Sequence, residues 1–558
     1  MQTAHYQVKV APNRMNSIFK SLVLGILLTL PAIAWADDPK FEHWPIDLKI
    51  NGTIVVAGSL SDFGLIKTAL PKLQQKQKTA ILTGNSTDQE TQNSLRSIFD
   101  DDQNVEILKV DGTTKQFRSI LRTSKCVLWH GDDPLSASLT KVASDCQSAF
   151  AEFIDDGNTL VVIGSPAEIV SKFYLPPAQG QPETAGLNLT PDCVIETEFS
   201  GSGNDRDSLL RVLTDHPRCV GVGLEFNSVL ILSGRKLFVL GKGTAKFFLA
   251  ASEQKPVRTQ TIRSALARRS RDPNSVTVDL TQWRRAAIDR TLAPFPAAKP
   301  DKPFVENGTL MIVGGGGTPR GLMQQFIKAA GGKDHAKLVF IPCAENDTVR
   351  KKQRVVESWK RAGVKHATFI HTKDRNQSNT DEEFLAPLKD ATGIWFGGGR
   401  QWNFSDSYYG TQAHQLMKDV LKRGGVIGGS SAGASIQANY LARATPIGNF
   451  KIMAFGYERG GLGFLSGVAI DQHFSQRRRH KDMTQLVNTH PQLLGIGIDE
   501  STAIIVQKSK AKVVGRGKVH FYDRNQPVVP GEPDFVALGQ GAVYDLAKRK
   551  VIEEPEAS

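Results

Sequence analysis

The chain has 558 residues, which is more than one ordinary hydrophobic core organises, so we expect at least two domains. Its composition, 40% hydrophobic and 22% charged, is that of a globular protein rather than a disordered or fibrous one. The formal net charge of +13 indicates a basic surface, and because no nucleic-acid-binding module is recognisable we expect no nucleic-acid partner.

The first 36 residues are predicted to be a signal peptide, with Met15 as an alternative start of the chain. A mostly apolar stretch, Ser21 to Ile33, precedes the A-x-A cleavage site Ala34-Trp35-Ala36. The stretch is short for a membrane span, so we predict that it is removed and that the protein is periplasmic or extracellular. An uncleaved anchor is the alternative. No other segment predicts contact with a membrane.

An alternation of short apolar runs with helical stretches then continues to the C-terminus. This alternation predicts an α/β fold with a mostly parallel sheet covered by helices on both faces. The pattern occurs twice: "NGTIVVAG" at 51–58 resembles "NGTLMIVG" at 307–314. Similarly, "HPRCVGVGLEFNSVLIL" from His216 resembles "HPQLLGIGIDESTAIIV" from His490. We therefore predict a duplicated domain, with one copy at 45–252 and the other at 304–552.

The segment between the copies, 253–303, is rich in arginine and then in proline. It is predicted to be a linker whose arginines lie on a solvated surface. The chain also has five cysteines, whose spacing fits no metal motif, and we predict neither a metal nor a cofactor. Whether any of them pair is left open. They are Cys126, Cys146, Cys193, Cys219 and Cys343.

The second copy contains a nucleophile-elbow motif. Residues 429–433, Gly-Ser-Ser-Ala-Gly, fit the pattern G-x-S-x-G between a predicted strand and a predicted helix. Small residues must flank the nucleophile because the turn is sharp, and the register makes that nucleophile Ser431. A phosphate-binding P-loop is excluded because no lysine follows the glycines.

A reactive serine needs a general base, and the base needs an acid to orient it. His473 follows a short apolar run, and Glu500 follows the predicted strand "LLGIGID". Strand ends of this kind meet at the carboxyl edge of a parallel sheet, where such folds place their sites. The residues therefore predict a Ser431–His473–Glu500 triad.

Four motifs in this order, "FGGGRQ", "GGSSAGA", "DQHFSQRRR" and "GIGIDE", resemble peptidase family S51 and, within it, the cyanophycinases. The resemblance covers about 304–525. It implies a class I glutamine-amidotransferase-like three-layer sandwich. It also implies a serine peptidase that hydrolyses cyanophycin, multi-L-arginyl-poly-L-aspartate, to β-Asp-Arg dipeptides through an acyl-enzyme.

The same resemblance implies the site residues. Ser431 is the nucleophile, His473 the base and Glu500 the orienting acid. The family's third arginine falls near Asp482, where only Lys481 offers a substitute. Implied substrate-binding residues are Gln401, Asp471, Gln472, Arg477 and Arg479. The backbone N–H groups expected to form the oxyanion hole are those of Ala432, Gly398 and Gly399. The glycine-rich run at 314–321 is interpreted as a tight turn near the site.

The first copy is predicted to be non-catalytic. Alignment with the second copy places Glu198 at the position of His473 and Phe226 at that of Glu500. It places Pro166 or Ala167 at the position of the nucleophile. We expect this copy to supply an interface, either in a homodimer or in an intramolecular pseudo-dimer.

The sequence is also compatible with two other functions. One is an aspartyl dipeptidase-like exopeptidase of family S51 that acts on small acidic peptides. The other is a non-catalytic binding protein with a vestigial site.

Overall fold

A computed structural model of the chain describes residues 44–45, 48–70, 77–84, 87–100, 102–110, 113–131, 137–174, 183–264, 275–342, 352–448 and 451–553. The predicted signal peptide and Cys343 lie outside these residues. His43–Ser558 form one compact unit. No helix within the described ranges is long and apolar enough to cross a membrane.

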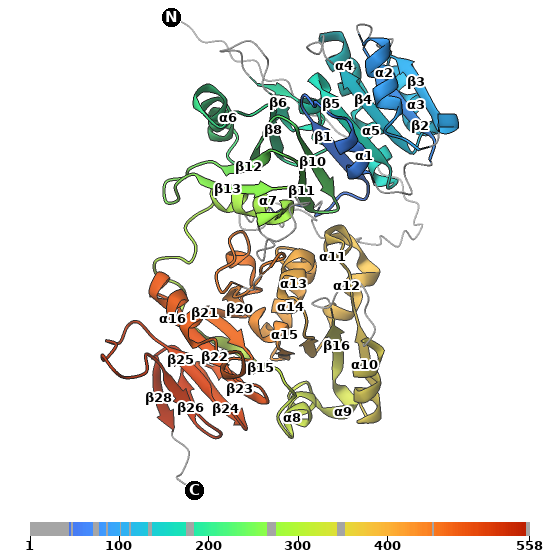
Figure 1. The fold of residues 1–558 in the computed structure, drawn as a ribbon. Helices are drawn as coiled ribbons and strands as arrows, with labels where there is room; N and C mark the ends of the chain where they lie inside the picture. Colours follow the sequence, from blue (N-terminus) through green and yellow to red (C-terminus); the bar gives the residue numbers. More distant parts are fainter. Residues whose placement is uncertain are drawn as a thin grey trace, which may run out of the picture. The chain divides into compact units, whose positions relative to one another are not determined.

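The first half of the chain is built around a sheet of eight strands (Figure 1). Strand β1 (Thr53–Ala57) lies parallel to β5 (Thr159–Gly164) and antiparallel to β10 (Ser228–Ser233). Across the sheet the order is β14 (Thr277–Asp279), β11 (Lys236–Gly241), β10, β1, β5, β4 (Cys126–Gly131), β2 (Thr79–Thr83) and β3 (Val105–Lys109). A second sheet has the order β13 (Arg258–Arg263), β12 (Thr244–Leu249), β9 (Val220–Leu224) and β8 (Cys193–Thr197), and β6 (Phe173–Tyr174) pairs with β7 (Thr184–Ala185).

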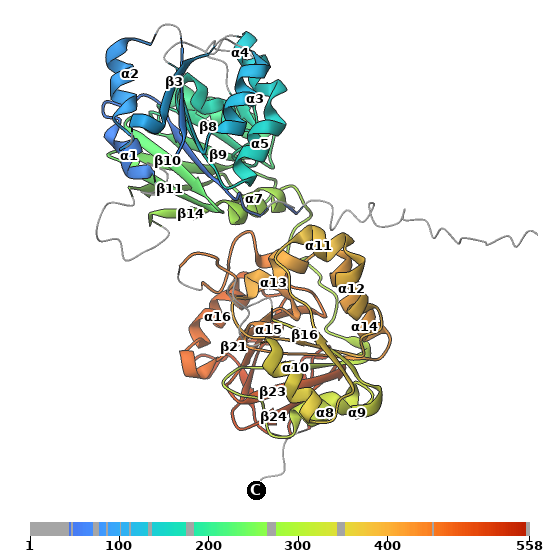
Figure 2. The same ribbon diagram turned by 90° about the vertical axis from the view of Figure 1, so that its right-hand side faces the viewer.

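Helices cover both faces of this large sheet, with α1 and α2 on one side and α3 and α5 on the other (Figure 2). The central strands β1, β2, β4 and β5 are buried along almost their whole length because helices cover both of their faces. The described helices of this half are α1 (Gly64–Ala69), α2 (Gln89–Arg96), α3 (Thr114–Thr123), α4 (Ala137–Asp145), α5 (Gln147–Asp155), α6 (Gly203–Asp215) and α7 (Leu280–Asp289).

The second half has a sheet of nine strands and another of five. The first has the order β17 (His366–Phe369), β16 (Lys337–Ile341), β18 (Gly393–Phe396), β19 (Val426–Ser430), β15 (Val305–Val313), β23 (Thr502–Lys508), β24 (Lys510–Gly515), β27 (Val543–Asp545) and β28 (Lys550–Glu553). The second has the order β20 (Ala438–Tyr440), β21 (Leu465–Gln472), β22 (Leu494–Ile498), β25 (Val519–Tyr522) and β26 (Val536–Leu538).

Helices α8 and α10 pack on one face of the nine-stranded sheet, and α12, α13 and α14 pack on the other. The described helices are α8 (Leu322–Ala329), α9 (Gly332–His335), α10 (Lys352–Arg361), α11 (Arg375–Thr380), α12 (Glu382–Lys389), α13 (Gln401–Tyr408), α14 (Gln412–Lys422), α15 (Ala432–Ser435) and α16 (His480–Thr489).

The two halves share one strand order. Seven neighbouring strands of the first half, β3-β2-β4-β5-β1-β10-β11, correspond in order and direction to β17-β16-β18-β19-β15-β23-β24 of the second. The smaller sheets correspond in the same way, β8-β9-β12-β13 with β21-β22-β25-β26. The predicted fold, an α/β sandwich with a mostly parallel sheet present twice, is therefore confirmed.

The interpretation of 253–303 as a solvated linker is wrong for much of its length. The segment contains β13, β14 and α7, and Arg284 and Arg285 on α7 are only 7% and 2% exposed. Charge runs are usually solvated, but here Arg284 pairs with Asp192, and Arg285 pairs with buried Asp406 and lies 3.7 Å from the ring centroid of Trp44. Residues 265–274 lie outside the described part of the segment. Cys126, Cys146, Cys193 and Cys219 are buried free thiols.

Candidate active site

Ser431 occupies a sharp turn between β19 and α15. Its backbone angles are φ 58° and ψ −114°, a strained conformation for any residue other than glycine. The turn is tight because three backbone segments converge on it: a Cβ on Gly429 would lie 2.2 Å from the carbonyl oxygen of Gly433, and one on Gly433 would lie 2.2 Å from that of Phe396. Both glycines of the G-x-S-x-G motif are thus sterically required.

The structure brings the three predicted triad residues together in one line. Ser431 Oγ lies 2.8 Å from His473 Nε2, and His473 Nδ1 lies 2.6 Å from Glu500 Oε1. His473 directly follows β21, and its backbone N–H donates to the carbonyl of Gly314 at 2.7 Å. Glu500 lies two residues beyond the end of β22, next to β21 in the sheet. These distances are those of a nucleophile, its base and an orienting acid.

The electrostatic surroundings keep His473 neutral. Burial lowers the pKa of His473, the hydrogen bond that its Nδ1–H donates to Glu500 raises it, and the positive charge of Arg477 lowers it again, so that this pKa lies below its usual value. A neutral imidazole whose Nδ1–H is donated to Glu500 presents the lone pair of Nε2 to the Ser431 hydroxyl.

The glycine-rich run at 314–321 packs against two residues of the triad, His473 and Glu500. A Cβ on Gly315 would lie 2.3 Å from Cε1 of His473, and one on Gly316 would lie 2.5 Å from both Cβ and Oε2 of Glu500. Both glycines have positive φ, 99° and 66°. The run is a tight turn packed against the base and the acid, as the sequence predicted.

The predicted oxyanion donors lie beside Ser431. A Cβ on Gly398 would lie 3.5 Å from that of Ser431, so this backbone closely approaches the nucleophile. Gly399, with φ 136°, lines the cavity beside Ser431. Ala432 directly follows Ser431 in the chain and begins α15. This closeness to Ser431 is consistent with the prediction that the backbone N–H groups of these residues bind a developing oxyanion.

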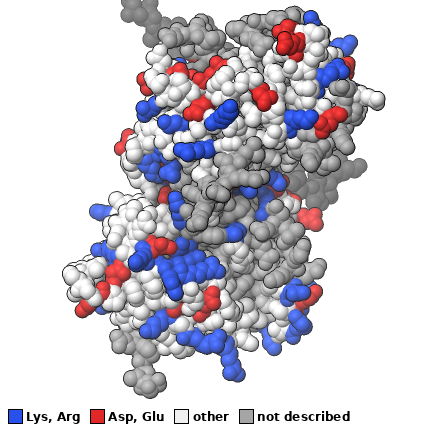
Figure 3. Space-filling view, viewed as in Figure 1, with Lys and Arg blue, Asp and Glu red and all other residues white. Residues whose placement is uncertain are grey.

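A cavity of about 440 Å³ opens at Ser431 and is strongly basic. Lys and Arg side chains gather densely on the face of the second half that Figure 3 shows. Of the residues predicted to bind substrate, Gln401, Gln472, Arg477 and Arg479 line the cavity. The full lining is Gly399, Arg400, Gln401, Ser431, Arg443, Gln472, Arg477 and Arg479.

Two predicted substrate contacts have internal partners. The amide nitrogen of Gln401 donates to the carbonyls of Ala442 and Arg443, each at 2.9 Å. Asp471 is fully buried, and its carboxylate accepts from Arg443 at 2.8 Å and from Arg479 at 2.7 Å. The structure therefore places Asp471 outside the cavity lining, as the anion that holds two of the lining arginines. This corrects its prediction as a direct substrate contact.

Sequence reasoning missed Arg443, which follows β20 in the stretch "LARATP" and belongs to no motif. Its side chain reaches the cavity, and its Nη2 donates to Asp482 at 2.6 Å. Asp482 is the position where the resemblance expects a third arginine. The acidic residue there was a signal that a cation comes from elsewhere in the fold, but only the tertiary structure identifies it.

In the first half, strand register identifies the residues at the three triad positions. Ala57 pairs with Ile163 as Val313 pairs with Ser430, so the residue equivalent to Ser431 is Gly164. This corrects the alignment that placed Pro166 or Ala167 there. Gly164 keeps the elbow conformation, with φ 76° and ψ −142°. The other two alignments agree with the register: Glu198 stands at the position of His473 and Phe226 at that of Glu500.

Comparison with known proteins finds similar sequences among the peptidases. The sequence model of peptidase family S51 matches residues 310–514. The chain is 30% identical over 226 residues to a cyanophycinase of Geminocystis herdmanii (strain PCC 6308), covering 40% of this chain and 82% of that protein. It is 30% identical over 221 residues to a cyanophycinase of Synechococcus elongatus, covering 39% and 68%. A peptidase of known structure from an acI-B1 Actinobacterium is 24% identical, with a TM-score of 0.32 over 43% of this chain and 98% of that one.

These matches identify the α/β chain as a hydrolase of the peptidase class. The chain belongs to peptidase family S51 and is a serine-type peptidase.

The pH dependence of kcat/KM is expected to change when the charge of Glu500 or of Arg477, which both act on His473, is removed. Because kcat/KM needs neutral His473, its acidic limb follows the pKa of this residue. Glu500→Gln removes a group that raises this pKa, so the limb moves to lower pH while kcat falls, by up to about 10⁴-fold. Arg477→Met removes a charge that lowers it, so the limb moves to higher pH. The exposed residues Glu532 and Arg361, changed in the same way, are controls. Limbs that move in the same direction, or not at all, contradict this account.

The packing of Gly316 against Glu500 predicts a loss of activity in Gly316→Ala. A methyl group there displaces the carboxylate, and a misplacement of about 1 Å lowers kcat by about 100-fold. Gly317→Ala is the matched control. Its φ is also positive, 125°, but its Cβ would meet only Ser501 Oγ, at 3.5 Å. Steady-state kinetics of both variants decide, and equal losses would show that backbone strain alone is responsible.

Proposed function

We propose that this protein is an exported cyanophycinase, which hydrolyses multi-L-arginyl-poly-L-aspartate to β-Asp-Arg dipeptides. The observation that carries the proposal is the cavity beside Ser431, where four arginines lie next to a serine, a histidine and a glutamate in hydrogen-bonded order. The likeness to cyanophycinases supports the same substrate.

In the proposed mechanism Ser431 Oγ attacks the peptide carbonyl while His473 Nε2 takes its proton. The negative charge on the carbonyl oxygen is stabilised by the N–H groups of Ala432 and of Gly398 or Gly399. His473 then gives the proton to the leaving amine, and an acyl-enzyme remains on Ser431. A water molecule, deprotonated by His473, hydrolyses this ester. Glu500 holds the imidazole orientation through both steps.

The arginines account for the substrate class. Each unit of cyanophycin carries the α-carboxylate of its arginine, and guanidinium groups bind carboxylates with paired hydrogen bonds. We assign this role to Arg477 and Arg479, and to Arg443 in place of the family's third arginine. Asp471 and Asp482 hold Arg443 from two sides, which fixes the direction of its side chain.

The first half, 45–252, is proposed to be a non-catalytic copy of the second. Glycine, glutamate and phenylalanine stand at the nucleophile, base and acid positions, and none of the three supports acyl transfer there. One active site per chain follows, in the domain at 304–552. The copy then serves as an internal partner, which makes the chain a pseudo-dimer.

The assay that tests the function uses the full chain with cyanophycin, with the isolated dipeptides β-Asp-Arg and Asp-X, and with Ser431→Ala. We expect wild type to release β-Asp-Arg from the polymer and Ser431→Ala to be slower by about 10⁶-fold. Ser430→Ala, the neighbouring serine, is the matched control and keeps its activity within a few-fold. Cleavage of free dipeptides alone would identify an aspartyl dipeptidase, and no turnover of either would indicate a binding protein.

Export is proposed from the sequence of residues 1–36. Mature protein recovered from the periplasm or the medium is expected to begin at Asp37, after the cleavage site. N-terminal sequencing of the purified protein measures this. An intact N-terminus on a membrane-bound protein would instead identify an uncleaved anchor.

A further inference from the structure

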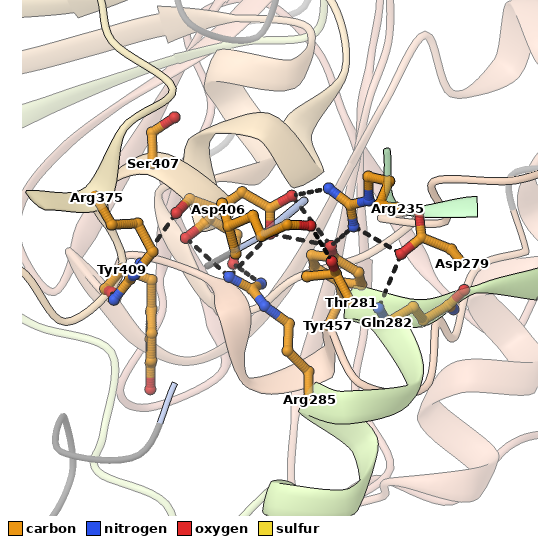
Figure 4. A network of polar contacts seen from close by, with 12 residues as sticks. Arg235, Asp279, Thr281, Gln282, Arg285, Arg375, Asp406, Ser407, Tyr409 and Tyr457 are labelled. Atoms are coloured by element: carbon orange, nitrogen blue, oxygen red, sulfur yellow. Dashed lines mark hydrogen bonds and ion pairs between the residues drawn. The ribbon is translucent and has the colours of Figure 1, made fainter. Parts of the chain in front are cut away.

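Helix α13 carries a cavity residue at one end and, further along, Asp406 of the buried polar network that Figure 4 shows. At its first turn, Gln401 lines the cavity, directly after the lining residues Gly399 and Arg400. At its second turn, Asp406 is 4% exposed and forms ion pairs with two arginines. One arginine belongs to the first half, 45–252, and the other to the segment 253–303 that follows it. These arginines are Arg235, in the turn between β10 and β11, and Arg285 on α7.

Arg235 contacts α13 at two successive turns. Its Nη1 lies 2.6 Å from Asp406, and its guanidinium group stacks on the ring of Trp402, 4.9 Å from the centroid. Trp402 and Asp406 are four residues apart and so lie on one face of the helix. The same guanidinium group binds both carboxylate oxygens of Asp279, at 2.6 and 2.8 Å. Asp279 also accepts from the backbone N–H of Gln282 and so caps α7. The Arg235–Asp279 pair therefore links the β10–β11 turn to the start of this helix.

Arg285 binds the same helix from α7. Its Nη2 lies 2.8 Å from Asp406 Oδ1, and its Nη1 donates to Ser405 Oγ at 3.1 Å. The guanidinium group is sandwiched between Trp44 and Tyr457, at 3.7 and 4.7 Å from the ring centroids. Burial raises the pKa of Asp406, but Arg285 and Arg235 outweigh this effect and hold the pKa below its usual value. The carboxylate is therefore an anion fixed between two cations.

Two guanidinium groups of the network pair with Asp406, and a third, that of Arg375 on α11, donates to the Asp406 backbone carbonyl at 3.0 Å. Two guanidinium groups face two carboxylates, Asp279 and Asp406, and all four side chains are at most 15% exposed. Removing Arg235 takes away the ion pair of Asp279 and one of the two ion pairs of Asp406, which favours displacement of the elements that carry these carboxylates. For Asp406 that element is α13, whose N-terminus leads directly into the glycine segment beside Ser431.

We propose that Arg235 and Arg285 are positioning residues for the reaction: by fixing α13, they set the position of the oxyanion segment 398–399 and of Gln401 relative to Ser431. This inference rests on the proposed function of the cavity at Ser431. It gives the first half a role in the chemistry of the second, although none of the described residues of the first half lines the cavity.

The test compares Arg235→Met and Arg235→Lys with wild type in the full chain. The first readout is the rate constant at which a small fluorophosphonate labels Ser431, because this reagent needs the nucleophile and the oxyanion hole but not substrate recognition. The second is kcat and KM on cyanophycin, and the third is the thermal unfolding temperature. Arg211→Met is the matched control, since Arg211 is a 47% exposed arginine of the first half that pairs with Glu183.

We expect Arg235→Met to lower both the labelling rate and kcat by ~10- to 100-fold at temperatures where the variant is folded. Arg235→Lys keeps the charge but cannot bridge two carboxylates and stack on Trp402, so an intermediate loss is expected. Arg211→Met changes neither rate. In a double-mutant cycle, the effects of Arg235→Met and Asp406→Asn on the labelling rate are expected to be less than additive.

Labelling and kcat at the wild-type level in a folded Arg235→Met variant, with only a lower unfolding temperature, would overturn the proposal. If Arg235→Met does not fold, Arg235→Lys decides by the same readouts, and a wild-type labelling rate in that variant likewise overturns it. Wild-type protein that is labelled but does not cleave cyanophycin would contradict the proposed substrate. The labelling rates would still test the role of Arg235.

Discussion

The second half is organised around the close approach of backbone segments at Ser431. The end of β19, the start of α15 and the end of β18 meet so closely that Gly429 and Gly433 leave no room for a Cβ. This contact forces Ser431 into a strained conformation and holds its hydroxyl toward His473. The turn at 314–317 imposes a similar constraint on His473 and Glu500. The geometry of the site thus comes mainly from backbone packing, and the polar side chains complete it.

The parts of the site that sequence predicted are those encoded locally. Ser431, His473 and Glu500 each stand at the end of an apolar strand beside small residues, and parallel strands bring such ends to one edge. Arg443 and the burial of Asp471 depend instead on contacts between segments 28 and 39 residues apart, which no local pattern records. The segment 253–303 was misinterpreted for the same reason. Its charge pattern is that of a solvated surface, and the partners that bury Arg285 lie 120 or more residues away along the chain.

The two halves share their backbone conformations but differ in the side chains at the three triad positions. The alternation of apolar and helical stretches predicted an α/β fold present twice, and the resemblance to family S51 implied the three-layer sandwich. The structure adds that the unusual backbone conformations are repeated as well. Glu198 has a positive φ, like His473, and Asn227 has one, like Ser501. At the nucleophile position the first half has Gly164, the residue that adopts this conformation without steric strain. The first half therefore keeps the shape of the elbow without the reactive group.

The covalent continuity between α7 and the second half has a consequence for how the protein responds to dilution. A subunit contact of the kind made by Arg235 and Arg285 is lost when a dimer dissociates at low concentration. Here both arginines belong to the same polypeptide as Asp406. The effective concentration of one surface near the other is then set by the chain itself and not by the surroundings. An enzyme built in this way stays assembled as a single molecule, however far it diffuses from its neighbours.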